Sequence, residues 1–313
     1  MKHTAADTSV RPGEYGGEAE DAGMAGYPVF DGIQIVYHDV HMQERRPNVE
    51  IVPRWERIIE IDHCMEGRIE CSKGEQFFYL SQGDMAIHKS VGVEHNTFFP
   101  TSHYQGITIV IDLDKAPKCL YCFLADVHIE PESIMNRFCG KEDLFIARSS
   151  QRLEHVFAEL YHVPEEVKRG YLKIKILEIL LFLSVFPSKQ GAGRKSYTFA
   201  QVRLAKEVCR YLSENMDRHI HIEQLVQEFH VSASQLQSCF RGVYGESVYA
   251  YIRRRKMQSA AHMLRSTDKS ILEIANDHGY ENGGKFASAF KSAMGLLPNE
   301  YRSMEPVSIP EQG

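Results

Sequence analysis

Apolar and polar residues alternate with a period of two through much of the N-terminal third of the chain. The alternation occupies short segments between Phe30 and about Leu113, separated by turn residues such as Gly67, Gly74 and Gly83. Successive side chains of a strand point to opposite faces, so this period predicts strands with one buried face. The succession of such strands and turns predicts an antiparallel sandwich or barrel.

A helical period replaces this alternation after about residue 132. Leu153 and Phe157 fall on one helical face, and a more apolar segment follows at residues 171–186. Such a helix needs cover on more than one side, either from its own domain or from a second copy of the chain in a dimer; both alternatives stay open. The run at 176–186 is about half the length that a bilayer requires and contains Glu178, so we expect no membrane span.

The C-terminal segment is predicted to be helical and to contain an internal repeat. Before it, residues 188–196 form a polar, glycine-containing linker. The repeat is a set of matching positions. At an offset of 49, Ile222, Leu225 and Val231 match Ile271, Ile274 and Tyr280; at an offset of 50, Leu236, Phe240, Gly245 and Tyr251 match Phe286, Phe290, Gly295 and Tyr301.

Each repeat is predicted to be a helix, a short turn and a second helix. Ser232 with Gln235, and Ser270 with Glu273, fit the capping-box pattern of helix starts. Gly279 suits the end of a helix because glycine tolerates a positive φ. These signals together indicate two helix-turn-helix units.

A long amphipathic helix is predicted at residues 246–266, between the two units. It carries four consecutive cations, Arg253, Arg254, Arg255 and Lys256. A basic run taken alone is usually a solvated face. Between two helix-turn-helix units, however, it is placed to meet the phosphates of DNA, whose neutralisation supplies most sequence-independent affinity.

Composition adds limits to this picture. The 313 residues, 43% of them hydrophobic, are enough for two domains with cores of their own. The net charge is −6, but residues 197–302 contain 14 Lys and Arg against 11 Asp and Glu, a net of +3, so the rest carries −9. Only the C-terminal part is therefore a candidate for an anionic partner. Residues 1–26 contain almost no large apolar residues and are expected to be a disordered leader without a secretion signal, which predicts a cytoplasmic protein.

The seven cysteines do not suggest a disulfide framework. Cys119 and Cys122 form a lone CxxC without a second pair, so reduced, ordinary thiols are expected rather than a zinc or redox site.

The C-terminal third resembles the DNA-binding domain of the AraC/XylS family of transcriptional regulators. The resemblance rests on the two half-repeats, YIRRRKM at 251–257, the IA-x3-GY of 274–280 and the closing P-x-x-YR at 298–302. It implies an α+β protein with a cupin-like antiparallel barrel before the helical domain. The implied division is a disordered leader at 1–26, a cupin-like effector domain at 27–130, a helical dimerisation segment at 131–187, a linker at 188–196, the DNA-binding domain at 197–302 and a tail at 303–313.

In that family each second helix enters a major groove, and the two helices reach the DNA at points about 34 Å apart along its axis. Matching the family pattern, and placing the apolar positions inward, gives the residues that would contact DNA. They are Ser234, Gln237, Ser238 and Arg241 in the first unit, Arg253, Arg254 and Arg255 between the units, and Asn282, Gly283, Gly284, Lys285, Ser288 and Lys291 in the second unit.

Two adjacent glycines at the start of the second reading helix need an explanation, because glycine weakens a helix. The cost is smaller in the first turn, which Asn282 can cap. Without side chains at Gly283 and Gly284, backbone N–H groups can approach a phosphate. The other interpretation is a loose turn before a short helix.

The N-terminal domain is expected to bind a small-molecule effector. Gly83-Asp84 and Gly92-x-x-His95 resemble half of a cupin signature, but the His-x-His and Glu of the other half are missing. His63, His88, His95 and His103 do not assemble a three-ligand site, so no metal and no cofactor are predicted. The candidate lining residues of an effector pocket are Trp55, Glu60, His63, Tyr79 and His88.

The sequence therefore predicts a homodimeric, effector-responsive regulator that binds double-stranded promoter DNA and is not an enzyme. Two alternatives remain. One is a cupin enzyme, an isomerase or dioxygenase, with an accessory helical domain. The other is a constitutive DNA-binding protein whose barrel only dimerises.

Overall fold

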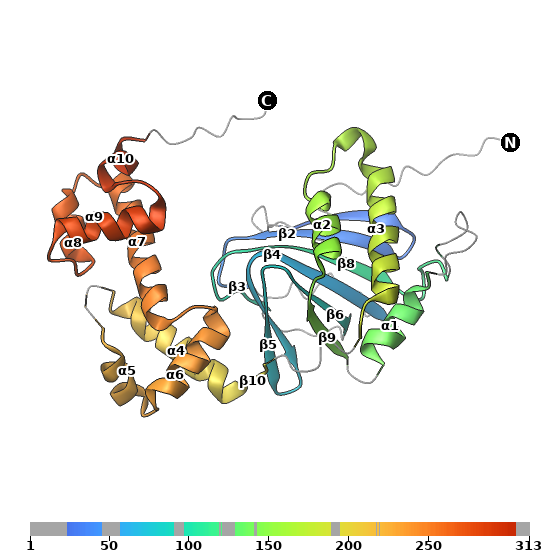
Figure 1. Ribbon diagram of the computed structural model, residues 1–313, viewed down its shortest axis with the longest axis horizontal. Coiled ribbons are helices and arrows are strands. Elements are labelled where there is room, and N and C mark those ends of the chain that lie inside the picture. The colour runs from blue at the N-terminus through green and yellow to red at the C-terminus, as the bar shows by residue number, and fades with distance from the viewer. Residues whose placement is uncertain are drawn as a thin grey trace. The chain divides into compact units, whose positions relative to one another are not determined.

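The computed structural model of the protein describes residues 24–45, 57–90, 97–118, 120, 129–140, 143–188, 195–216, 218 and 220–304. The chain divides into two compact units, Met1–Thr198 and Phe199–Gly313 (Figure 1). The first combines an antiparallel sheet with helices, and the second is helical. The predicted α+β class is confirmed. Among the described helices, none has the length and apolar character needed to cross a membrane.

An eight-stranded antiparallel sheet forms the centre of the first unit. Its main path runs through β1 (Met24–Phe30), β2 (Ile33–Val40), β8 (Tyr104–Asp112), β4 (Ile58–Lys73), β5 (Gln76–Ser81) and β10 (Tyr197–Thr198). The long strand β4 also pairs with β6 (Asp84–Ser90), which pairs with β9 (Leu144–Arg148), while β3 (Glu44–Arg45) and β7 (Thr97–Phe98) form a separate ladder. The period-two segments of the sequence are therefore strands. The turn expected at Gly67 is wrong, because β4 continues through it with a register shift between Cys64 and Glu66.

Three short strands lie where the sequence analysis did not expect them. Strand β1 begins at Met24, inside the expected leader; β9 interrupts the expected helical segment; and β10 joins the sheet from the expected start of the DNA-binding domain. Ladder hydrogen bonds join backbone groups, so Ala25 and Gly26 can pair with Tyr37 and Val36 without any alternation of their own. Pairing with a neighbouring strand, rather than local pattern, creates these strands.

Helices cover one face of this sheet. On β4, Ile59 and Ile61 are fully buried in a cluster that includes Ile107 and Ile109 of β8 and apolar residues of the helices. The covering helices are α1 (Pro131–Cys139), α2 (Gln151–Leu160) and α3 (Lys168–Val185) (Figure 1). The intervening residue Glu60 points to the other face, as the period of two requires.

Helix α3 has two apolar sides. Its inner side is buried in the cluster shared with the sheet, through Leu172, Ile176, Ile179, Leu180 and Leu183. Its outer side exposes Ile174 by 63%, Leu181 by 40% and Val185 by 73%. Packing within the unit therefore covers only part of the apolar surface of α3.

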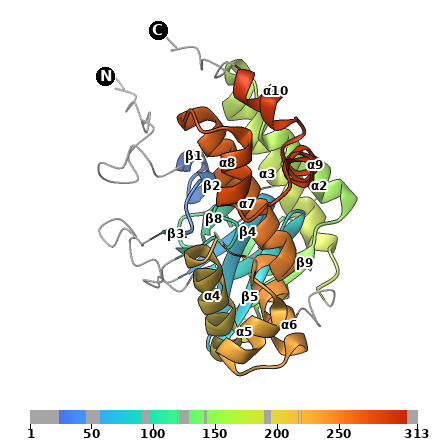
Figure 2. The same cartoon turned by 90° about the vertical axis from the view of Figure 1, so that its left-hand side faces the viewer.

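The second unit consists of seven helices within its described residues. They are α4 (Phe199–Glu214), α5 (Ile222–Phe229), α6 (Ala233–Tyr244), α7 (Val248–Ser266), α8 (Ile271–Asp277), α9 (Gly283–Met294) and α10 (Pro298–Ser303). Helices α5 and α6 form one helix-turn-helix pair and α8 and α9 the other, with the 19-residue helix α7 between them (Figure 1, Figure 2). The predicted connecting helix is confirmed.

The repeat extends to backbone geometry. Helices α6 and α9 have the same length and each ends at a glycine in the left-handed region, Gly245 at φ 81° and Gly295 at φ 79°. The turns correspond at an offset of 49, where His230 at φ 52° takes the place of Gly279 at φ 75°. The offset becomes 50 at the second helices because the second unit has one more turn residue.

Candidate nucleic-acid interface

Helix α6 presents a polar face that begins at a capped N-terminus. Ser232 Oγ accepts a hydrogen bond from the Gln235 N–H at 3.2 Å, which fixes the start of the helix where the sequence predicts it. Leu236 and Phe240 are buried, whereas the positions on the opposite face are exposed. The exposed set contains all four predicted reading residues, Ser234, Gln237, Ser238 and Arg241.

Helix α9 repeats this arrangement. Asn282 Oδ1 accepts hydrogen bonds from the N–H groups of Gly284 at 2.8 Å and Lys285 at 3.1 Å, so the predicted cap is confirmed. Phe286 and Phe290 are fully buried. On the other face, Gly284, Lys285, Ser288 and Lys291 are exposed and Gly283 is half-buried.

The fold does not require the glycine at position 283. A Cβ there would meet only Leu272 Cδ1, at 3.9 Å, which is an ordinary contact, and the equivalent position of the first repeat is Ala233. At Gly284 a Cβ would lie 3.1 Å from the capping oxygen of Asn282. The cap uses the N–H groups of Gly284 and Lys285, while the N–H of Gly283 has no hydrogen-bond partner among the described residues. The start of α9 therefore keeps one backbone donor that the cap does not use.

We expect Gly283→Ala to separate the two interpretations of the glycine pair. Alanine should leave the free energy of unfolding unchanged or raise it by less than about 1 kcal/mol, because helix propensity improves and the space is open. Affinity for DNA should fall roughly 10-fold, because a Cβ holds the N–H away from the phosphate and a hydrogen bond to a charged group is lost. Thermal unfolding measures the change in stability, and fluorescence anisotropy measures the change in DNA affinity. Ala233→Gly, which makes the opposite exchange at the equivalent position of α6, is the control. Unchanged DNA affinity would identify a simple turn residue.

The basic run on α7 divides into cations with different roles. Arg254 donates to Glu246 Oε1 from Nη2 at 2.7 Å and from Nε at 3.0 Å, and its guanidinium lies 5.3 Å from the centroid of the Tyr251 ring. Arg253 and Arg255 are half-buried. The expected phosphate role of Arg254 therefore competes with an internal ion pair.

Lys256 is a structural residue, although the sequence analysis grouped it with the phosphate-facing cations. Its side chain is only 6% exposed, and Nζ donates to His278 O at 2.8 Å and to Arg218 O at 3.0 Å. His278 ends α8 in the second repeat, whereas Arg218 precedes α5 in the first. The ammonium thus joins backbone carbonyls of both repeats to the helix between them.

Of the expected effector-pocket residues, Glu60 and His88 lie side by side on the sheet face opposite the helices. They are directly paired on β4 and β6, and His88 Nε2 lies 3.5 Å from Glu60 Oε2 and 2.8 Å from Asp62 Oδ2. Thr108 Oγ1 donates to Asp62 Oδ1 at 2.6 Å, and His38 Nε2 lies 2.8 Å from Thr108 Oγ1. The sequence analysis missed Asp62, although a residue two positions from Glu60 on a strand must share its face.

The carboxylates of Glu60 and Asp62 favour the protonated form of His88 on this polar face. Burial alone would lower the pKa of His88, but the hydrogen bond to Asp62 and the charges of Asp62 and Glu60 outweigh burial and raise the pKa to about 9. For the carboxyl group of Asp62 the signs are reversed. Burial alone would raise its pKa, but the interactions with His88 and the hydrogen bond from Thr108 outweigh burial and lower the pKa. An imidazolium between two carboxylates is thus the expected state at neutral pH.

His63 is on the opposite face of the sheet, away from Glu60 and His88. It is 5% exposed and stacks on Phe157 of α2, with ring centroids 4.2 Å apart and planes 6° from parallel. Neither ring nitrogen has a hydrogen-bond partner within the described residues. Burial, followed by the positive charge of Arg148, lowers the pKa of His63 to about 4. The structure makes His63 a core residue beneath α2.

Tyr79 and Trp55 complete the expected pocket set. Tyr79 is buried on β5, where its hydroxyl donates to Glu70 Oε2 at 2.5 Å and its ring contacts Tyr197. Trp55, His95 and the Cys119–Cys122 pair lie outside the described residues. Among the members of the expected set that the structure describes, only Glu60 and His88 are therefore in contact.

We expect His63 to make the first unit sensitive to acid. Its pKa is about 4 in the folded chain and about 6.5 when unfolded, so the unfolded state binds more protons and stability falls as pH drops from about 6.5 to about 4. The loss is of order 3 kcal/mol at most. Urea unfolding at several pH values should show this component in the wild type and not in His63→Phe, while the exposed His155→Gln control retains it. An acid loss equal in all three proteins would exclude His63 as its source.

Part of the second unit matches a known family of domains. The model of a helix-turn-helix domain family matches residues 225–304. The chain is 30% identical over 141 residues to the XylDLEGF operon transcriptional activator 2 of Pseudomonas putida, a match that covers 44% of this chain and 86% of that protein. The chain belongs to the AraC/XylS family of transcriptional regulators. It is accordingly a DNA-binding protein of the helix-turn-helix type.

Two further similarities each cover about a third of the chain or somewhat more. An uncharacterized HTH-type transcriptional regulator of Escherichia coli K12, YdiP, is 33% identical over 121 residues, which are 39% of this chain and only 38% of that protein. Among solved structures, the C-terminal domain of AraT from Geobacillus stearothermophilus is 29% identical and aligns with 34% of this chain and 89% of that chain, with a TM-score of 0.32.

Proposed function

We propose that this AraC/XylS protein reads promoter DNA by placing α6 and α9 in two successive major grooves, under the control of a small-molecule effector bound by the first unit. The observation that carries the DNA-reading part is the matched geometry of the two helices. Each is capped by a polar side chain, buries its aromatic face and exposes a polar face with at least one long cation. Two equivalent helices suit two major-groove segments about one helical turn apart.

The side chains define the expected readout. Gln237 is suited to the hydrogen-bonding edge of adenine, and Arg241 and Lys285 to guanine or to phosphate. Ser234, Ser238 and Ser288 reach only a short distance, so part of the specificity comes from DNA shape. Lys291 near the end of α9 completes the proposed set of base and backbone contacts.

Phosphate contacts are assigned to groups beside the reading faces. Arg253 and Arg255 on α7 supply charge, and the N–H of Gly283 at the capped start of α9 supplies a directed donor. Arg254 contributes only when it exchanges Glu246 for a phosphate. These contacts position the reading helices without reading sequence.

The effector site is assigned to the polar sheet face around Glu60, Asp62 and His88. The side chains of Glu60, Asp62 and His88 are 29%, 15% and 25% exposed, respectively. A ligand can therefore reach these groups, although they are partly shielded from water. Such charged groups on a sheet surface suit a polar effector with hydrogen-bonding groups, in a cupin-like barrel as the family resemblance implies. A thermal-shift screen tests the site, because a ligand selective for the folded state raises the unfolding temperature. A protein that no ligand stabilises would instead be a constitutive regulator.

The dimer is assigned to the outer side of α3. Ile174, Leu181 and Val185 recur at spacings of seven and four, which places them on one exposed stripe. A second copy of α3 would cover that stripe. Apart from the unexpected strands β1, β9 and β10, we propose the predicted division of the chain. Residues 27–130 would bind the effector, residues 131–187 would form the dimer and residues 197–302 would bind DNA.

Selection from a random duplex DNA pool with the full chain tests the proposal. Sequencing of the retained DNA should show two short elements about one helical turn apart. Enrichment of only one element at low salt would mean that only one of the two helices reads the DNA sequence. A pool without enrichment would contradict sequence-specific reading by both helices.

A further inference from the structure

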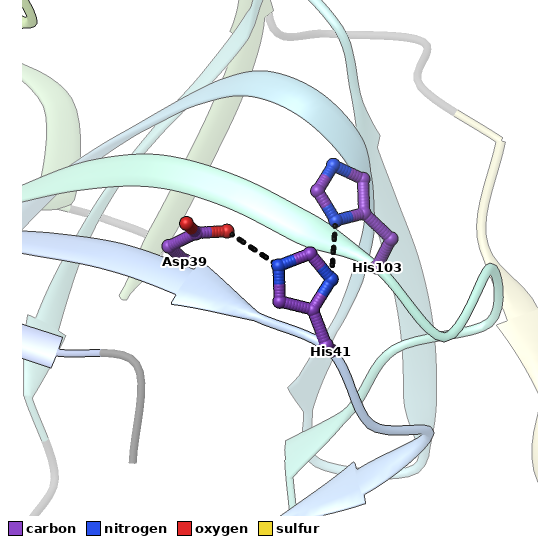
Figure 3. A group of neighbouring side chains, drawn as sticks. All are labelled: Asp39, His41 and His103. Atoms are coloured by element: carbon purple, nitrogen blue, oxygen red, sulfur yellow. Dashed lines mark hydrogen bonds and ion pairs between the residues drawn. The ribbon is translucent and has the colours of Figure 1, made fainter. Parts of the chain in front are cut away.

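Two histidines face each other where β2 ends and β8 begins, on the first unit and apart from the proposed effector face. His41 follows β2 and His103 precedes β8, one step beyond the last ladder pair, Val40 with Tyr104. Figure 3 shows the two rings with Asp39 beside His41. His41 Nδ1 and His103 Nδ1 are 3.4 Å apart, although the residues are 62 positions apart in the sequence.

The second nitrogen of each ring contacts a carboxylate. Asp39 Oδ1 lies 3.1 Å from His41 Nε2, and Glu66 Oε2 lies 3.3 Å from His103 Nε2. Carboxylate oxygens only accept hydrogen bonds, so each neutral ring carries its proton on Nε2. Each Nδ1 is then an acceptor, and two lone pairs meet at 3.4 Å with no proton to share. Either an added proton on one ring or a metal ion between the two nitrogens resolves this conflict.

The distance fits a metal ion better than it fits a hydrogen bond. Two nitrogens held about 2.0–2.1 Å from a tetrahedral Zn²⁺ stand about 3.3–3.4 Å apart. Ligating histidines also typically donate the other ring N–H to a carboxylate, which fixes the tautomer and makes the ligand more basic. Asp39 and Glu66 occupy those positions on both rings.

The backbone at His103 is held in place by its neighbours. Thr101 Oγ1 donates to His103 O at 2.7 Å, and Ser102 adopts a φ of 58°. Gly67 of β4 passes so close that a Cβ there would lie 2.0 Å from the same carbonyl oxygen. The backbone position of His103 is therefore fixed by the turn before β8 and by the close approach of β4.

We propose that the first unit binds one divalent transition-metal ion, Zn²⁺ in the simplest case, through His41 Nδ1 and His103 Nδ1. Water fills the remaining coordination positions, since His41 and Asp39 have side-chain exposures of 70% and 60%. Asp39 and Glu66 orient the rings and offset the charge of the ion. The bound ion would cross-link the end of β2 to the start of β8. Sequence analysis alone did not include His41 and predicted no metal.

Zinc titration of the full chain, prepared without a polyhistidine tag, tests the proposal. Isothermal calorimetry should give one ion per chain, and thermal unfolding should shift upward with ZnCl₂. His41→Gln and His103→Gln should each remove both effects, because one imidazole alone does not chelate. His155→Gln is the matched control: it is another exposed histidine of the first unit with a carboxylate at 3.3 Å.

Asp39→Asn distinguishes a built site from two surface histidines. Loss of the carboxylate behind a ligating imidazole should weaken zinc binding by about 10- to 100-fold while leaving one ion per chain. The proposal is overturned if the wild type binds no zinc, if either ligand variant binds as the wild type does, or if His155→Gln reduces binding equally. DNA binding of the variants is a separate measurement, so these outcomes do not depend on the proposed promoter function.

Discussion

Replacing Arg241 and Lys285 together with alanine is expected to lower the affinity for the selected DNA by roughly 30-fold to 10⁴-fold. Each reading helix loses its best-placed long cation for a base or phosphate contact, and the two residues lie on different helices of the repeat. A contact of this kind is worth about 1–3 kcal/mol, so the pair accounts for about 2–6 kcal/mol. Fluorescence anisotropy with the selected DNA, and with a scrambled duplex of equal length, measures the change.

The controls separate base reading from simple charge. Arg210→Ala removes an exposed cation from α4, outside the reading helices, and should change affinity for both duplexes little. If Arg241 and Lys285 read bases, the double variant loses discrimination between selected and scrambled DNA; if they meet only phosphates, both affinities fall together and the salt dependence becomes shallower. Affinity equal to that of Arg210→Ala would contradict the assignment of both helices.

Much of the DNA-binding unit could be predicted from sequence because its signals are local. The apolar positions of the two second helices, their capping residues and the glycine in the left-handed region at Gly279 all follow from spacing along one helix. Lys256 could also have been recognised as buried. It lies one helical turn before Ala260 and two turns before Leu264, on the buried side of α7. Its hydrogen-bond partners could not, because both are backbone carbonyls distant in sequence.

The sheet unit was less predictable, because its sites depend on strand pairing. Parity along β4 already separates Glu60 from His63, so a strict use of the period of two would have excluded one of them from any shared pocket. The pairing of Glu60 with His88, and of β2 with β8 beside His41 and His103, depends instead on register across the sheet. Register comes from packing and turn geometry over many residues, and a single sequence does not reveal it.

The second large effect is expected in the core of the second repeat, where Phe290→Ala should lower the free energy of unfolding by about 3–5 kcal/mol. Phe290 is fully buried, and its ring centroid is 5.8 Å from that of Phe286 and 5.4 Å from that of Tyr301. Removing the ring leaves a cavity in the cluster that α7, α8 and α9 form, beside Tyr301 of α10. Urea unfolding measures the loss, and the 63%-exposed Phe199→Ala should change stability by less than about 0.5 kcal/mol.

The repeat makes the location of this damage testable. Phe290 belongs to a buried cluster confined to α7, α8 and α9, with Tyr301 of α10 packed against it, whereas its counterpart Phe240 packs on Tyr244 and Tyr251 in the first repeat. Hydrogen exchange in Phe290→Ala should therefore accelerate in α8 and α9 while α5 and α6 stay protected. On DNA, the variant should keep the element read by α6 and lose the element read by α9. Equal loss of protection in both repeats would mean that α7 and Lys256 couple them into one cooperative unit, and that neither reading helix folds without the other.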